Sequence, residues 1–180
     1  MRKIILDLAI SLDGFIEGPK GEIGWCIMDD DMDFEGFLSR IDTIFYGRVS
    51  YETWGNYQPI TNAPETEQAL WREVHSKKKY VFSHEQKEDG RATFIHTDLP
   101  ERVREIKSQK GKDIWLYGGA SLIQSFIQSN LIDQYQLSVH PVALGSGKPL
   151  FEELKKRLAL QLIESKTFRS GVTQLIYQPK

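Results

Sequence analysis

The segment with the clearest chemical potential is the glycine pair Gly118-Gly119. An apolar run at residues 114–117 stops at this pair, and apolar residues with helical spacing follow at once over residues 122–127. The pattern predicts a strand that passes into a helix with almost no connecting loop. Two glycines let the backbone come close to a ligand, and the start of a helix offers free N–H groups and a partial positive charge. The segment could therefore bind a phosphate, although a tight turn without a ligand would explain the same residues.

Other apolar runs also end in residues that could bind a ligand. Asp13-Gly14, Gly47-Arg48 and Ser83-His84 each follow such a run. Ligands collect at the carboxyl ends of parallel strands, and arginine forms paired contacts with phosphate oxygens. Together with the glycine pair, these residues predict one cleft for a ligand with several phosphates. Each also has a simpler explanation: Arg48 as a cation on a helix face, and Gly47 and Ser83 as turn residues.

Other catalytic and metal-binding motifs do not fit the sequence. Residues 145–148 read Gly-Ser-Gly-Lys, but Val142 stands where a P-loop has its first glycine, and Pro149 replaces the residue that binds magnesium. The four histidines lack the spacing of metal ligands, so we expect no metal site. There is no Rossmann glycine motif and no Gly-x-Ser-x-Gly elbow, and Cys26 has no base nearby in the sequence. These observations argue against a hydrolase or a metalloenzyme.

Composition predicts one globular domain over residues 1–180. The chain has 180 residues, of which 40% are hydrophobic, and this is enough for a substantial core. Its formal net charge of −2 gives no general attraction to nucleic acid or to an anionic membrane. No apolar run approaches the length of a membrane span, and Asp7 comes too early for a signal peptide. With the single cysteine Cys26, which excludes a disulfide framework, these features predict a cytoplasmic protein.

Strand and helix patterns alternate along most of the chain. The expected strands are residues 3–10, 42–46, 79–83, 93–95, 113–117, 134–139, 158–168 and 172–178. The expected helices are residues 29–39, 50–54, 64–75, 100–109 and 120–129. The last two strands flank Ser170-Gly171 and predict an antiparallel hairpin. The order predicts an α/β fold with a mostly parallel, helix-covered sheet and an antiparallel C-terminal edge.

Four motifs in a fixed order carry a family resemblance. They are Ser-Leu-Asp-Gly-Phe-Ile at 11–16, Gly-Arg-Val-Ser-Tyr-Glu at 47–52, Val-Phe-Ser at 81–83 and Leu-Tyr-Gly-Gly-Ala-Ser-Leu at 116–122, with further support from residues 141–151. In this order they resemble the dihydrofolate reductase superfamily. The closer match is to the reductase (C-terminal) domain of the bifunctional riboflavin-biosynthesis deaminase–reductase and to its stand-alone bacterial relatives. The similarity covers nearly the whole chain.

The resemblance implies a three-layer fold and an NADPH-dependent hydride transfer to a pteridine-like or ribosylaminopyrimidine-like substrate. Arg48 and Ser83 would lie near the 2′-phosphate, and a loop over residues 12–23 would close over the nicotinamide. A cis peptide bond is implied between Gly118 and Gly119. The residues that would contact the cofactor are Ala9, Ile10, Gly47, Arg48, Val49, Ser83, Gly118, Gly119, Ala120, Ser121 and Leu122.

The catalytic acid is expected in the acidic cluster at the start of helix 29–39. The resembling reductases carry a substrate-facing carboxylate there, and counting back from Gly47 without gaps places Asp31 in that position, with Asp30 and Asp33 as alternatives. Hydride transfer to a C=N bond leaves negative charge on nitrogen, and a nearby proton donor lowers this barrier. Acids in the first turn also cap a helix and complement its dipole, and this second explanation is compatible with the first.

The chain departs from the riboflavin reductases where they bind the ribose phosphate. Their Asp-x-Pro…Arg segment is replaced here by residues 51–59, and the motifs of the fused zinc deaminase are absent. Arg72 is the one candidate for the arginine that holds the folate tail in dihydrofolate reductases. We therefore predict a stand-alone NADPH reductase with an open substrate. The alternative is a non-catalytic protein that binds a nucleotide or another ligand on the same fold.

We also expect a homodimer. The resembling proteins tend to form pairs, and the C-terminal hairpin provides an edge strand region, with residues such as Leu175 and Tyr177, that a second copy could cover.

Overall fold

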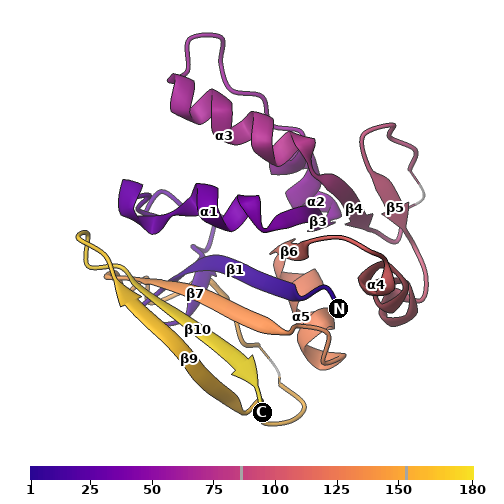
Figure 1. The fold of residues 1–180 in the computed structure, drawn as a ribbon. Coiled ribbons are helices and arrows are strands. Elements are labelled where there is room, and N and C mark those ends of the chain that lie inside the picture. Colours follow the sequence, from indigo (N-terminus) through magenta and orange to yellow (C-terminus); the bar gives the residue numbers. More distant parts are fainter. Residues whose placement is uncertain (86, 153) are drawn as a thin grey trace.

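One twisted sheet organises the molecule (Figure 1). The computed structural model describes residues 1–85, 87–152 and 154–180, without the side chain of Asp30. Its main sheet has eight strands in the order β5-β4-β3-β6-β1-β7-β10-β9, and β2 and β8 form a separate pair. The strands from β5 to β7 are parallel, and β10 and β9 extend the sheet antiparallel. The predicted α/β class and the antiparallel C-terminal hairpin are confirmed.

The strands lie close to their predicted positions. They are β1 (Ile4–Ser11), β2 (Phe15–Glu17), β3 (Ile41–Gly47), β4 (Lys78–Phe82), β5 (Thr93–Ile95), β6 (Asp113–Gly118), β7 (Gln134–His140), β8 (Lys148–Pro149), β9 (Leu160–Thr167) and β10 (Thr173–Pro179). The sequence did not predict the short pair β2 and β8, which joins the loop after β1 to the loop after β7.

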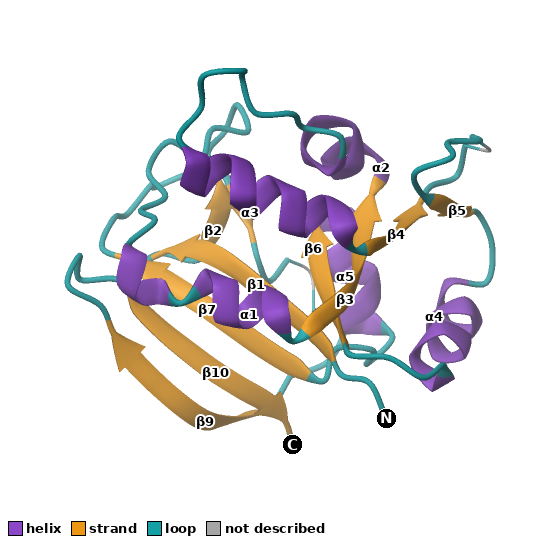
Figure 2. Ribbon diagram, turned by 45° about the horizontal axis from the view of Figure 1, so that its top comes forward, coloured by secondary structure: helices purple, strands orange, loops and turns teal. Residues whose placement is uncertain are grey.

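Helices cover the sheet on both faces, which completes the expected three layers (Figure 2). The helices are α1 (Phe34–Ser39), α2 (Arg48–Ser50), α3 (Glu65–Ser76), α4 (Leu99–Ser108) and α5 (Ala120–Gln128), with one turn of 3-10 helix η1 (Asp30–Met32) and one turn of π-helix η2 (Tyr51–Gly55). One buried apolar cluster joins the sheet to α4 and α5, and a second joins the other face to α1 and α3.

Alternation along β1 divides its side chains between the two clusters. Ile4 and Leu6 belong to the cluster beneath α4 and α5, whereas Ile5 packs with Phe37 and Trp115 on the α1 and α3 face. Since side chains two residues apart share a face of a strand, Asp7 lies on the same face as Ile5. A carboxyl group is therefore placed among aromatic residues in the middle of the sheet.

The expected single helix at 29–39 is interrupted. Asp33 has φ +51° and lies between η1 and α1, and its side chain accepts a hydrogen bond from the backbone N–H of Gly36. A left-handed residue ends one helix and a carboxylate caps the next, so Asp33 starts α1 rather than continuing a longer helix. Capping by the acidic cluster is thus confirmed at Asp33.

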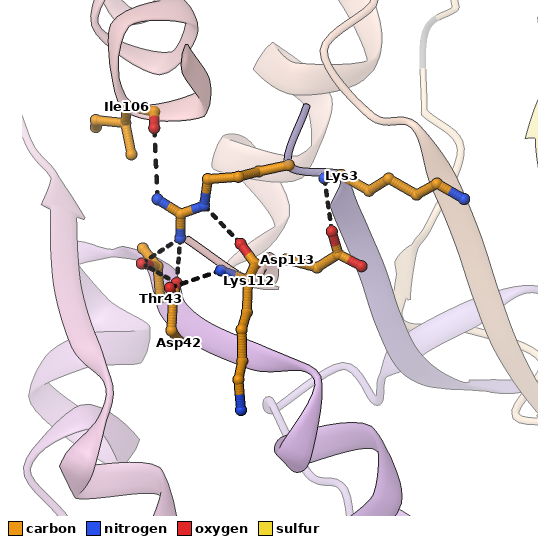
Figure 3. A network of polar contacts seen from close by, with 7 residues as sticks. Lys3, Asp42, Thr43, Ile106, Lys112 and Asp113 are labelled. Carbon is orange, nitrogen blue, oxygen red and sulfur yellow. Dashed lines mark hydrogen bonds and ion pairs between the residues drawn. The ribbon is translucent and has the colours of Figure 1, made fainter. Parts of the chain in front are cut away.

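A polar network holds the amino ends of three strands together, at the edge opposite to the glycine pair (Figure 3). Arg2 is buried; it donates to the Lys112 carbonyl and to the Thr43 hydroxyl, both at 2.6 Å, and it pairs with Asp42. Asp42 also accepts from the Lys112 backbone N–H at 2.8 Å. These bonds link β1, β3 and the segment before β6, so their role is structural.

Candidate active site

Two cavities meet at the carboxyl edge of the parallel strands. The first has a volume of about 720 Å³ and the second about 480 Å³. Glu17, Ser50, Gly119 and Ala120 line both cavities. The cavities therefore join where β6 passes into α5, close to the middle of the sheet.

The first cavity gathers the residues that the sequence placed at successive strand ends. They follow β3, β4 and β6 and are Gly47, Arg48, Val49, Ser83, His84, Gly119, Ala120, Ser121 and Leu122. This convergence follows from the topology, because β4, β3 and β6 are parallel neighbours and their carboxyl ends share one edge. The prediction of one cleft is confirmed for the ends of β3, β4 and β6. It is wrong for Asp13 and Gly14 after β1, which line neither cavity.

The glycine pair gives the cavities a bare backbone wall, since Gly119 lines both of them and Gly118 lines the second. Gly118 has φ +121°, a conformation that favours glycine, and the peptide bond to Gly119 is cis as predicted. Gly119 has φ −67°, which suits any residue, but a Cβ atom there would lie 3.1 Å from the Ser50 hydroxyl oxygen. Conformation therefore requires glycine at Gly118, whereas close approach to Ser50 limits the side chain at Gly119.

The helix that follows presents free N–H groups to the same space. The first intrahelical bond of α5 runs from the Ile123 N–H to the Gly119 carbonyl at 3.0 Å, and within the described part of the chain no side chain caps this helix. The N–H groups of Ala120, Ser121 and Leu122 precede this bond and have no intrahelical partner. They form a helix start with free donors, the arrangement that an anion site requires.

Arg48 lies at the rim of the first cavity with its guanidinium already oriented. Its Nη1 donates to Glu52 at 2.8 Å, and its Nε lies 3.7 Å from Glu85. The Ser83 hydroxyl accepts from the backbone N–H of Glu85 at 3.0 Å, which places Ser83 and Arg48 around the same turn. Exposed ion pairs of this kind contribute little to stability. An incoming phosphate could therefore replace Glu85 as the partner of Arg48 at a small cost in free energy.

The second cavity has aromatic walls. Trp115 makes edge contacts with Phe34 and Phe37, with ring centroids 5.6 and 5.5 Å apart, and Trp54 lies parallel to Trp71 at 6.4 Å. These five residues come from α1, β6, η2 and α3, and all line the cavity. Such walls suit a flat ring of low polarity.

The floor of the second cavity carries a polar row from three strands. Asp7 on β1 is paired in register with Gln136 on β7, and Ser138 on β7 is paired with Gln174 on β10. All four residues line the cavity. Burial raises the pKa of Asp7 to about 7, although the Arg40 charge and a hydrogen bond with Gln136 act in the opposite direction. Asp7 is therefore a carboxyl group that holds its proton near neutral pH.

The structure does not bear out the expected position of Asp31 as the substrate-facing acid. Asp31 is not among the residues that line the cavities, and its carboxylate lies 3.6 Å from the Arg169 guanidinium in the hairpin turn. The segment that the gapless count from Gly47 crosses is not one helix, because Asp33 ends η1 before α1 begins. Asp33 caps α1, and the side chain of Asp30 lies outside the described residues.

The expected neighbours of the nicotinamide are divided. The resemblance implies that Ala9 and Ile10 flank the nicotinamide and that Gly118 helps to hold the pyrophosphate. Ala9 lines the second cavity, and so does Gly118. Ile10, in contrast, is buried in the apolar cluster beneath α4 and α5 and does not line either cavity. Alternation along β1 explains the difference, since Ile10 shares a face with Leu6 rather than with Asp7.

The described residues hold no group of three or more histidine, cysteine, aspartate or glutamate side chains arranged for a metal ion. Within the same residues, none of the helices has the length and apolar character needed to cross a membrane.

A family model described as the RibD C-terminal domain matches residues 2–174. The chain belongs to this family. Its relatives include Uncharacterized protein YyaP of Bacillus subtilis, 57% identical over 98% of this chain and 94% of that protein. RibD-type reductase domains belong to the dihydrofolate reductase-like superfamily, so the family resemblance is confirmed.

Solved structures of RibD-like proteins share the fold. A putative riboflavin biosynthesis protein from a Shewanella species superimposes with a TM-score of 0.79 at 25% identity, over 100% of this chain and 99% of that one. The Thermotoga maritima diaminohydroxyphosphoribosylaminopyrimidine deaminase/5-amino-6-(5-phosphoribosylamino)uracil reductase gives 0.69 at 14% identity, over 99% of this chain and 57% of that one. RibD C-terminal family membership supports a reductase of the riboflavin-biosynthesis type.

The RibD-like motif at residues 11–16 has a structural explanation in this chain. The Asp13 carboxylate accepts from the Ser11 hydroxyl at 2.6 Å and from the backbone N–H groups of Leu144 and Gly145 at 3.1 and 2.7 Å. The Ser11 hydrogen bond, followed by that from Gly145, lowers the pKa of Asp13 to about 2. The motif therefore ties the loop after β1 to the glycine-rich loop after β7.

Asp7 is the residue that the sequence reasoning missed, beyond noting that it argues against a signal peptide. Its signal was present, because a lone carboxyl interrupts the otherwise apolar run of residues 4–10. A charged group in a buried strand is costly unless it has a partner or keeps its proton, and such groups gather at functional sites.

Proposed function

We propose that the protein is an NADPH-dependent reductase that transfers a hydride to a pteridine-like or ribosylaminopyrimidine-like heterocycle. The observation that carries this proposal is the junction of the two cavities at Ser50, Gly119 and Ala120. One cavity is built for a phosphate-bearing ligand, and the other is built for a flat ring. A cofactor in the first would meet a substrate in the second at their common wall.

The residues of the first cavity fit a dinucleotide. A Cβ atom at Gly47 would lie 3.3 Å from the Gly119 backbone nitrogen, so the two glycine segments approach closely and leave backbone exposed. The start of α5 would hold the pyrophosphate, and Arg48 and Ser83 would bind the 2′-phosphate. Ala9 and Gly118 would border the nicotinamide.

NADPH, when bound, would supply the hydride that adds to the carbon of a C=N bond. The nitrogen of that bond then needs a proton. Asp7 lines the second cavity on the floor below the aromatic walls and holds a proton near neutral pH, so we assign it the role of donor. Gln136 lies beside it in the ladder and would orient the ring.

Replacing Arg48 tests the cofactor site. Arg48→Ala should weaken NADPH binding by roughly 10–150-fold, which corresponds to a lost charge-assisted contact of about 1.5–3 kcal/mol, and should leave NADH binding nearly unchanged. Titration of nicotinamide fluorescence measures both affinities. Arg72→Ala is the matched control, since Arg72 is exposed, pairs with Glu65 and lies outside both cavities. Equal losses for the two cofactors would show that Arg48 only supports the fold.

Turnover tests the reductase assignment itself. NADPH oxidation should accelerate in the presence of a pterin, a dihydrofolate or a riboflavin precursor. If NADPH binds but none of these compounds accelerates its oxidation, the non-catalytic alternative is favoured.

We also propose a homodimer formed through the C-terminal hairpin. Leu175 and Tyr177, the residues expected at the edge, lie on β10, which is paired on both sides with β7 and β9. Strand β9 ends the sheet instead, and its residues Leu162 and Ile163, which point to opposite faces, are both 50% exposed. An apolar edge strand of this kind is a site for pairing with another chain. Light scattering at micromolar concentration should give about twice the chain mass of 20.8 kDa. A mass near that of one chain would reject the dimer.

A further inference from the structure

The second cavity has few charged side chains in its lining. Its ionisable side chains, apart from Cys26 and Tyr117, are Asp7, Glu17 and His140. Among the described residues that line it, none is a lysine or an arginine. Both ring nitrogens of His140 face backbone carbonyls, those of Ser138 at 2.9 Å and Ile27 at 3.2 Å, so neither is directed at a ligand.

The cations around the cavity have other partners. Arg40 lies over the Phe37 ring at 5.8 Å, and Arg72 pairs with Glu65. In the hairpin region, Lys166 donates to the Asp31 carbonyl at 3.0 Å, and Arg169 pairs with the Asp31 carboxylate. Asp31 thus contacts both cations, and none of these three residues lines the cavity.

A phosphate or a carboxylate would therefore be poorly accommodated. A phosphate monoester carries close to two negative charges and is held in proteins by arginine, lysine or a helix start. Among the described residues, α1 also starts at this cavity, at Phe34, but the Asp33 carboxylate caps it. The start of α5 has no side-chain cap, and the proposed cofactor occupies it. A second anion in the apolar space would lose its hydration beside Asp7 and Glu17 without a compensating partner.

The floor instead suits the polar edge of an uncharged ring. Asp7 and Gln136 stand side by side on neighbouring strands, with Ser138 and Gln174 next to them. A carboxyl and a carboxamide both accept and donate, so they match a ring edge that alternates N–H and C=O or N groups. The aromatic walls then enclose the ring faces.

We infer that the substrate is a flat heterocycle with an N–H-bearing edge and no phosphate or carboxylate group, held at that edge by Asp7 and Gln136. The inference rests on the proposed function, and it deepens that function by separating this protein from reductases whose substrate is a ribose phosphate. It also accounts for the absence of the Asp-x-Pro…Arg segment from residues 51–59.

A matched pair of ligands tests the inference. 5-Amino-6-(5-phosphoribosylamino)uracil and the same compound after removal of its phosphate differ in that group alone. Quenching of tryptophan fluorescence reports binding, since Trp54, Trp71 and Trp115 line the cavity. In the presence of NADPH, we expect the dephosphorylated compound to bind at least ~10-fold more tightly, because the buried anion lacks a partner.

An added cation should reverse the preference. Met28 lines the cavity and is 67% exposed, so a long side chain there can reach the ligand from the mouth. Met28→Lys should raise affinity for the phosphorylated compound and leave the dephosphorylated one within about twofold. Ile23→Lys, at another partly exposed lining position, repeats the test, and thermal melts check that both variants fold.

The outcomes separate the two proposals. Equal or tighter binding of the phosphorylated compound to the unmodified protein would overturn the inference, and so would the lack of quenching by either compound. NADPH binding, followed on its own by nicotinamide fluorescence, reports on the first cavity. Its loss would overturn the proposed function whatever the ligand pair shows.

Discussion

Asp7→Asn should lower turnover by roughly 10²–10⁴-fold, the usual contribution of a general acid, while NADPH affinity stays within about twofold of that of the unmodified protein. Asparagine keeps the shape and the hydrogen-bonding capacity of the side chain but cannot give up a proton to the substrate. Asp7 lines only the second cavity, so the first cavity should be unaffected. Steady-state oxidation of NADPH and a separate binding titration measure the two quantities.

The pH profile distinguishes a proton donor from a merely structural residue. With a pKa of about 7, Asp7 is protonated below that pH and loses its proton above it. The kcat/KM of the unmodified enzyme should therefore decline as pH rises through about 7, and Asp7→Asn should lack this decline. The other ionisable groups lining this space are Glu17, Cys26, Tyr117 and His140, and the charge of Arg40, which does not line it, also acts on Asp7. His140→Gln is the control, and it should keep the decline.

The thermal stability of the protein should also depend on the protonation of Asp7. Burial raises the pKa of Asp7 above its value in the unfolded chain, so between about pH 4 and pH 7 the folded state binds more protons than the unfolded state. The contribution of Asp7 is therefore most favourable at low pH and is lost as pH rises through 7. Relative to Asp7→Asn, the unmodified protein should lose thermal stability over that interval. A parallel pH dependence of the two melting temperatures would contradict the assignment.

The features that sequence reasoning placed correctly are those with strong local signals. The strand-to-helix passage at Gly118-Gly119 and the segments at Gly47-Arg48 and Ser83 could be located because glycines end apolar runs abruptly. In a parallel sheet, the carboxyl ends of neighbouring strands lie at the same edge, and here these segments line the first cavity. The C-terminal hairpin was equally clear, because two strand patterns flank the Ser170-Gly171 turn.

The second cavity could not be predicted in the same way, because its residues come from many separate segments. Asp7 and Gln136 are neighbours only through β1–β7 pairing, which joins residues more than a hundred positions apart. Asp31 was placed by counting back from Gly47 without gaps, across a segment that the left-handed Asp33 divides into η1 and α1. A local pattern does not show such a break, since aspartate is a common residue both within first turns and at caps.

Gly119→Val should abolish NADPH binding while the fold is kept. The dihedral angles of Gly119 suit any residue, and a Cβ atom would meet only the movable Ser50 hydroxyl, at 3.1 Å. The added methyl groups would fill the junction of the two cavities, where the cofactor must pass along the start of α5. Loss of two hydrogen bonds to the pyrophosphate, each worth about 1.5–3 kcal/mol, predicts a fall in affinity of ~100-fold or more.

A contrast between the two glycines makes this prediction sharper. Gly118→Ala should lower the melting temperature, since Gly118 has φ +121° and a Cβ atom would lie 3.2 Å from Ile123 Cδ1. Gly119→Ala should melt close to the unmodified protein and still bind NADPH more weakly, which keeps the test decisive if valine disturbs folding. Circular dichroism melts and nicotinamide fluorescence titrations measure both effects. A folded Gly119→Val protein with unchanged NADPH affinity would show that the cofactor does not follow this wall, because a β-branched side chain in the junction leaves no room for its pyrophosphate.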